Sequence, residues 1–260
     1  MTSTNSSTRT ARLVAAATLC GALAACGTSD APTSFAPGGE QGRIRFVNVI
    51  TDTTRGRVNA TLEGLPFGVN LTYTLSTPAT LPAPNTGIYA AILAGSRTLV
   101  LRRTADTNST VASFQLTIAA NADVTVYGTG GAGGTPVTSF LTTDDNVAPS
   151  AGQVRVRVVH LSPTAGPVDI FVTAPGADLA TATPTLANFA VRTASSYLAV
   201  PAGTYQVRVV PAGTAPAARA AAVAINVASL ALPAGGVRTI VAADNNIGGA
   251  PLRAFVLVDR

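Results

Sequence analysis

The sequence lacks several side chains on which protein chemistry most often depends. Its 260 residues include no tryptophan and no lysine, one histidine and two cysteines. A single histidine excludes metal sites built from several histidines and leaves no second imidazole for a proton relay. We therefore expect a chain that is not an enzyme and that holds no metal or cofactor.

Charge is also scarce, because charged residues make up only 11% of the chain. All 17 basic residues are arginine, which we interpret as codon usage in a GC-rich genome. Without Arg9 and Arg12, which lie in the leader described next, the net charge falls from +5 to about +3. Such a balance does not demand nucleic acid, and we expect no nucleic-acid partner.

Residues 1–25 have the pattern of a bacterial export leader. A polar start carries Arg9 and Arg12, and an apolar run of 11 residues follows from Leu13 to Leu23. A membrane-spanning helix needs about 20 apolar residues, so this run predicts a cleaved signal peptide and not an anchor.

The end of the leader, Leu23-Ala24-Ala25-Cys26, resembles the bacterial lipobox. It predicts cleavage between Ala25 and Cys26 and lipidation of the Cys26 sulfur, whereas the alternative is an ordinary cleavage site before a cysteine. Cys20 leaves with the leader, so no intrachain disulfide can form. Residues 26–41 are rich in Gly, Pro, Ser and Thr and predict a flexible tether. We expect a lipid-anchored protein of the cell envelope, at the outer membrane or cell surface, because Gly27 and not Asp follows the cysteine.

Strict alternation marks residues 152–163, where three valines share one face of a strand and Arg155 and Arg157 share the other. This pattern predicts a half-buried antiparallel strand. A weaker copy, with Arg43 and Arg45, opens the other half of the chain. The sequence therefore predicts two tandem repeats of one structural unit, over residues 42–145 and 152–260, with a linker at 146–151.

Each half contains seven or eight short strand candidates separated by turn residues. This spacing predicts an all-β chain with two tandem immunoglobulin-like β-sandwich domains. The alanine-rich segment 215–222 favours a helix by propensity, but its counterpart in the first half alternates like a strand. We expect a strand from Ala222 to Val227, with a short helical turn before Val223 as the alternative.

Two segments of the second half have a distinctive sequence: Val156 to Val172 (VRVVHLSPTAGPVDIFV) and Leu198 to Val209 (LAVPAGTYQVRV). Both resemble the bacterial domain-of-unknown-function family 4397. The resemblance covers residues 42–259 and implies secreted or lipid-anchored surface proteins with tandem β-domains, without an established activity. The first half departs from the pattern, since Asn48 stands where His160 stands in the second.

The candidate binding face consists of Arg43, Arg45, Arg155 and Arg157. These arginines are expected on the outer face of the first strand of each repeat, either simply solvated or in contact with acidic polysaccharide, lipid headgroups or protein.

Three further motifs favour structural roles. Gly128 to Gly133 fits a dinucleotide-loop pattern, but strand-like residues follow it, which predicts a hairpin. The polar clusters at 144–146 and 244–246 predict turns, with calcium binding as the alternative. His160 is expected to be a hydrogen-bonded group at a strand end.

These observations favour a non-enzymatic binding or adhesion module for a glycan or an envelope protein, held to the membrane through Cys26. The alternative is a structural spacer of the envelope without its own ligand. A hydrolase has the least support.

Overall fold

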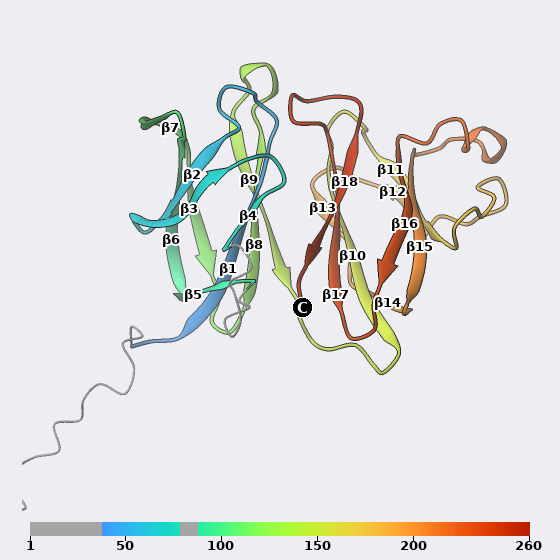
Figure 1. The fold of residues 1–260 in the computed structure, drawn as a ribbon, viewed down its shortest axis with the longest axis horizontal. Coiled ribbons are helices and arrows are strands. Elements are labelled where there is room, and N and C mark those ends of the chain that lie inside the picture. Colours follow the sequence, from blue (N-terminus) through green and yellow to red (C-terminus); the bar gives the residue numbers. More distant parts are fainter. Residues whose placement is uncertain (1–37, 79–87) are drawn as a thin grey trace, which may run out of the picture. The chain divides into compact units, whose positions relative to one another are not determined.

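The structure, a computed structural model, describes residues 38–78 and 88–260. Gly39–Arg260 form one compact unit built almost entirely of strands (Figure 1). The predicted signal peptide, the lipidation site Cys26 and nearly all of the tether lie outside the described residues. Among the residues that are described, none belongs to a helix with the length and apolar character needed to cross a membrane.

The first repeat is a sandwich of two sheets. One has the strand order β4-β1-β8-β9, with β5 also paired to β1, and the other has the order β3-β2-β6-β7. The strands are β1 (Gln41–Ile50), β2 (Val58–Leu62), β3 (Leu65–Leu71), β4 (Ser76–Thr77), β5 (Ala90–Leu93), β6 (Gly95–Arg103), β7 (Asp106–Ile118), β8 (Asp123–Gly130) and β9 (Val137–Asp144). A 3₁₀ helix, η1 (Ala132–Gly134), lies between β8 and β9.

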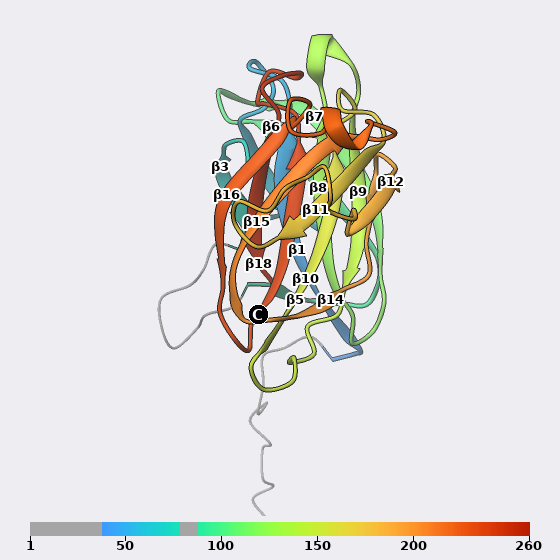
Figure 2. The ribbon, with the colours of Figure 1, turned by 90° about the vertical axis from the view of Figure 1, so that its right-hand side faces the viewer.

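The second repeat has the same plan. Its sheets have the orders β13-β10-β17-β18, with β14 also on β10, and β12-β11-β15-β16. Figure 2 shows the molecule with this repeat facing the viewer. The strands are β10 (Gln153–Leu161), β11 (Val168–Thr173), β12 (Leu186–Phe189), β13 (Thr193–Ala194), β14 (Leu198–Pro201), β15 (Gly203–Pro211), β16 (Ile225–Leu232), β17 (Val237–Ala243) and β18 (Arg253–Val258). The predicted fold class, all-β with two tandem sandwiches, is confirmed.

Each sandwich has its own apolar core between its two sheets. In the first repeat the core includes Ile44, Phe46, Leu99 and Leu116. In the second it is richer in valine and includes Val156, Val158 and Ile170. The alternating residues of β1 and β10 thus point into the cores that the sequence assigned to them.

The opposite faces of β1 and β10 are also buried, which the sequence did not predict. Both strands pair in parallel with the last strand but one of their repeat, β1 with β8 and β10 with β17. Their second faces contribute to a third apolar cluster that contains residues of both repeats. Its buried members are Val47, Val49, Tyr127, Val159, Leu161, Val241, Ala243 and Leu257. The prediction of a half-buried antiparallel strand was therefore wrong, because the other repeat takes the place of solvent.

The alanine-rich segment contains a 3₁₀ helix, η2 (Pro216–Ala218), and β16 begins only at Ile225. The expected strand from Ala222 was thus wrong in its first three residues, and the alternative helical turn is present. The connection packs beside Phe171 and Leu179, where Ala222 and Val223 cover a small apolar cluster. Here the intrinsic preference of alanine prevails because pairing between β15 and β16 reaches only Val209 and Ile225.

Candidate functional site

The four arginines of the predicted binding face have two different environments. Arg45 and Arg157 are only 1% and 2% exposed, whereas the side chain of Arg43 is 56% exposed and that of Arg155 is 17% exposed. The prediction of an outer face was wrong for Arg45 and Arg157, because the two repeats pack together through this face. Arg45 and Arg157 are therefore not accessible to a ligand while the repeats are associated.

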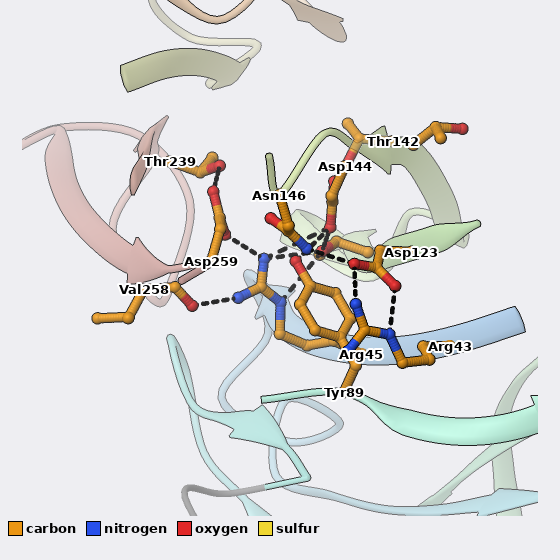
Figure 3. A network of polar contacts seen from close by, with 12 residues as sticks. Arg43, Arg45, Tyr89, Asp123, Thr142, Asp144, Asn146, Thr239, Val258 and Asp259 are labelled. Carbon is orange, nitrogen blue, oxygen red and sulfur yellow. Dashed lines mark hydrogen bonds and ion pairs between the residues drawn. The ribbon is translucent and has the colours of Figure 1, made fainter. Parts of the chain in front are cut away.

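Arg45 crosses from the first repeat to the end of the second (Figure 3). Its Nη2 lies 2.6 Å from Asp259 Oδ1, and its Nη1 donates to the Val258 carbonyl oxygen at 2.8 Å. Within its own repeat, Nε and Nη2 donate to Thr125 Oγ1 at 3.1 and 2.8 Å. The guanidinium is therefore fully occupied.

Arg157 makes the reciprocal set of contacts. It forms a buried ion pair with Asp144 of the first repeat and donates from Nη1 to the Thr143 carbonyl oxygen at 3.1 Å. In its own repeat, Nε donates to Thr239 Oγ1 at 2.8 Å. Each repeat thus supplies an arginine that pairs with the aspartate of the other, which is the arrangement of an isologous, two-fold interface.

Two tyrosines also belong to this network, which we call the swapped network because each arginine pairs with the aspartate of the other repeat. Tyr89 donates to Asp144 Oδ2 at 2.7 Å, and its ring centroid lies 4.7 Å from the Arg45 guanidinium carbon. Tyr197 donates to Asp259 Oδ2 at 3.1 Å, and the corresponding distance to Arg157 is 4.8 Å. Burial raises the pKa of both tyrosine hydroxyls. Two arginines and two aspartates balance in charge, so the network is suited to joining the repeats.

His160 is fully buried and hydrogen-bonded, as predicted. Its Nε2 donates to the Gly166 carbonyl oxygen at 2.8 Å, and Nδ1 faces the Ser162 backbone N–H at 3.5 Å. Burial lowers the pKa of the imidazole, which favours its neutral form. Asn48 at the same place accepts from the Ile50 N–H at 3.1 Å and donates to the Gly56 carbonyl oxygen at 2.7 Å.

The serine beside His160 is not directed at it. The Ser162 hydroxyl donates to Asp244, whose other oxygen accepts from Thr164 Oγ1 at 2.6 Å and from the Gly249 N–H at 3.0 Å. Asp244 therefore organises two loops of the second repeat, as expected of a turn-forming residue. Within residues 38–78 and 88–260, no three histidine, cysteine or acidic side chains gather as metal ligands would.

The glycine-rich segment forms a hairpin, as predicted. Strand β8 continues to Gly130, η1 makes the turn, and β9 returns antiparallel from Val137. No helix follows that would direct its N-terminus at a phosphate.

This hairpin is part of a surface that joins both repeats, which we call the distal loop surface. It comprises loops 51–57 and 131–136 of the first repeat and 244–252 of the second, which lie together at the upper end in Figure 1. Arg55 Nη2 donates to the carbonyl oxygens of Gly131 and Thr135, both at 3.0 Å. Gly248 lies so close to the first repeat that a Cβ there would be 2.7 Å from the Ala132 Cβ.

Two cavities open at the distal loop surface, and both have walls from both repeats. One, of about 400 Å³, lies between Arg57 and Tyr73 of the first repeat and Asn246 and Arg253 of the second. The other, of about 440 Å³, adjoins Ile247, which is 59% exposed. The arrangement can hold a small polar ligand or a protruding segment of another protein.

Of the residues that line these cavities, sequence reasoning considered only Asn246, in a polar cluster, and Gly133, in the glycine-rich segment, and it favoured turns for both. When Val58 is aligned with Val168 and Pro136 with Pro251, Arg57 corresponds to Pro167 and Arg253 to Thr138, so neither arginine has an arginine counterpart in the other repeat. Both lie next to turns, which is the only signal that the sequence contains.

A model of the family described as domain of unknown function (DUF4397) matches residues 65–171 and 172–260. The chain belongs to this family, and the predicted resemblance is confirmed. The junction between the two matched ranges falls within β11, whereas the sheets of the two repeats divide between β9 and β10. A comparison with curated proteins finds no match.

Similar solved structures are distant from this chain. One is described as alpha-glucan recognition by family 41 carbohydrate-binding modules from streptococcal virulence factors. It is 9% identical, covers 81% of this chain and 96% of its own, and has a TM-score of 0.25. Another is a leucine-rich repeat protein from Bacteroides thetaiotaomicron, which is 14% identical, covers 77% of this chain and 26% of its own, and has a TM-score of 0.19.

Proposed function

We propose that this chain is a lipid-anchored, non-enzymatic binding protein of the bacterial cell envelope that holds a glycan or an envelope protein at its distal loop surface. The observation that carries the proposal is that loops of both repeats pack together there. They line two open cavities, each with residues from both repeats. Of the four arginines that the sequence favoured for binding, Arg45 and Arg157 are buried between the repeats.

The course of β1 suits this role. The chain enters the first sandwich at Gln41, and β1 then runs for 10 residues to Ile50, where the distal loops begin. A strand of that length spans about 33 Å. The distal loop surface therefore lies at the end of the first sandwich opposite to Gln41, where the chain enters it.

Two matched glycine variants test the proposal. Both Gly248 and Gly249 have positive φ, so alanine strains the backbone similarly at either place. Only at Gly248 does the added Cβ meet Ala132, at 2.7 Å, whereas nothing lies within 4 Å of it at Gly249. Gly248→Ala should displace the two loops and abolish binding, and Gly249→Ala should retain it.

Binding is measured on a glycan array and by pull-down from an envelope extract, with thermal melting to verify folding. We expect the wild type to bind a specific partner in one of the two assays. Absence of a specific partner in both would contradict the proposal and favour the spacer. The observation that favours a spacer is the swapped network, since it fixes the two repeats against each other.

The anchor is tested separately. Cys26→Ser should remove fatty acid from the protein and leave it uncleaved or soluble. Metabolic labelling with a fatty-acid probe measures this directly, and an unlabelled wild type would contradict the anchoring.

A further inference from the structure

We infer that the cavity between Arg57 and Arg253, called here the two-arginine cavity, binds the carboxylate of an acidic oligosaccharide. The inference rests on the proposed function and names the class of ligand for one part of the distal loop surface.

Most described arginines are already engaged. Within the described part of the chain, the guanidiniums of Arg57, Arg103 and Arg253 have neither a hydrogen bond nor an ion pair. Two of these three line the same cavity, one from each repeat. Arginine presents a planar set of donors that matches a carboxylate, so two free guanidiniums in one cavity form an anion site.

The carboxylate that lines this cavity does not neutralise them. Asp52 Oδ2 pairs with Arg55 Nε at 2.6 Å, and Oδ1 accepts the N–H groups of Thr54 and Arg55 at 2.8 and 2.9 Å. Its negative charge is thus balanced locally, and the charges of Arg57 and Arg253 remain available to a ligand.

A cavity of about 800 Å³ at the opposite end of the first sandwich differs in this respect. There Arg43 is bound to Asp123 at 2.5 Å, and Arg260 donates to the Asn146 carbonyl oxygen at 3.4 Å. Neither guanidinium is free, so that cavity lacks the feature that defines the two-arginine cavity.

The walls of the two-arginine cavity indicate a hydroxylated ligand. Thr53, Thr72 and Asn246 contribute hydroxyl and amide groups, and Tyr73 forms part of the wall. A volume of about 400 Å³ falls in the lower part of the range of small-molecule sites. A uronic acid combines a carboxylate with several hydroxyls on one compact ring and so satisfies both the charge and the walls.

The test uses the full chain and a trisaccharide of galacturonic acid, titrated by calorimetry at low ionic strength. The methyl ester of the same trisaccharide is the neutral control. We expect the acid to bind at least roughly tenfold more tightly than the ester, and Arg57→Gln and Arg253→Gln each to weaken it roughly tenfold or more. Arg103→Gln removes an equally unpaired arginine outside the cavity and should leave the affinity unchanged.

Several results would overturn the inference: no binding of the acid, equal affinity for acid and ester, or an equal loss with Arg103→Gln. A triglutamate peptide that binds as tightly as the trisaccharide would reject the saccharide class. If a partner found on the array or in the extract is lost with Gly248→Ala but kept with both arginine variants, the inference fails and the proposed function stands. Lack of any partner contradicts the proposed function itself.

Discussion

His160 and Asn48 occupy equivalent places and show how two side chains meet one structural demand. His160 Nδ1 faces the Ser162 backbone N–H, and Asn48 Oδ1 accepts the Ile50 N–H. Each side chain also donates to a carbonyl oxygen of the loop that follows its strand. The position therefore requires one hydrogen-bond acceptor and one donor in a fixed geometry, and it does not require proton transfer.

His160→Asn should therefore cost about 1 kcal/mol of unfolding free energy, the net value of an ordinary hydrogen bond. Binding to any partner should be unchanged. Denaturant unfolding and the pull-down measure the two effects. A folded variant that has lost binding would contradict the structural role.

The same variant should flatten the pH dependence of stability. Burial lowers the pKa of His160 below its ordinary value of 6.5, so the unfolded chain takes up a proton at a higher pH than the folded chain. The contribution of His160 is present above pH 6.5 and is lost as the pH falls below it. Unfolding free energies from pH 8 to 5 should decline more in the wild type than in His160→Asn, and equal declines would contradict this account.

Arg45 allows a sharper test of the swapped network. Arg45→Met should destabilise the chain by about 3–5 kcal/mol, because Asp259 then remains buried without its cation. Arg43→Met is the matched control on the same strand and should cost at most about 1 kcal/mol, since Arg43 is half exposed. Adding Asp259→Leu to Arg45→Met should recover part of the loss, and simple additivity would show that the pair is not coupled.

At this scale the sequence predicted which residues share a face but not what covers that face. Alternation placed Arg155 and Arg157 opposite the valines of β10, and the structure confirms that division. Whether solvent or protein lies beyond the arginines depends on how the two repeats pack, which brings Asp144 and Asp259 to the arginine of the other repeat. A local pattern contains no such information.

Among the elements, the two outer sheets differ in how they are covered. In the second repeat, connections 174–185 and 212–224 pack against Phe171, whereas in the first the equivalent connections are tight turns. Arg219 holds the two together, since Nη1 donates to the carbonyl oxygens of Ala182 and Leu179 at 2.9 and 3.2 Å. Its guanidinium carbon also lies 5.2 Å from the Phe171 ring centroid.

Arg219→Met should release these connections without unfolding the sandwich. We expect cleavage within 174–185 and 212–224 to become several-fold faster under limited proteolysis, while the melting temperature changes by only a few degrees. Arg102→Met, which removes exposed hydrogen bonds to the Thr107 and Asn108 carbonyl oxygens, is the control. Cleavage at the wild-type rate in Arg219→Met would show that the arginine does not hold the connections.

Strand positions were predictable because alternation and turn residues are local signals. Most strands fall where apolar residues recur at every second position, as β7 and β15 illustrate. The conformation of the alanine-rich segment was not predictable in this way, since its counterpart in the first repeat alternates like a strand. Two sequences that occupy equivalent places need not share a conformation when one of them lies beyond the paired part of the sheet.

For the whole molecule, the contacts that join the repeats span very different sequence separations: Arg45 and Asp259 are 214 positions apart, whereas Arg157 and Asp144 are 13 positions apart. The sequence contains one indication of these contacts, because both repeats have an arginine on the first strand and an aspartate at the end of the last. That indication could not show that the pairs are swapped between repeats. The swap, the shared apolar cluster and the contacts of Arg192 with Ser139 and Thr138 make one unit of two sandwiches.

The central claim, that the repeats form a single unit through this interface, is tested most directly by cutting the linker. A protease site introduced at Pro149 is cleaved in the full chain, and the product is analysed by size-exclusion chromatography. A chain that also carries Arg45→Glu and Arg157→Glu is the control, since like charges then face each other and the cut halves should separate. The account predicts that the cut wild type elutes as one particle of the uncut size, and elution as two separate sandwiches would contradict it.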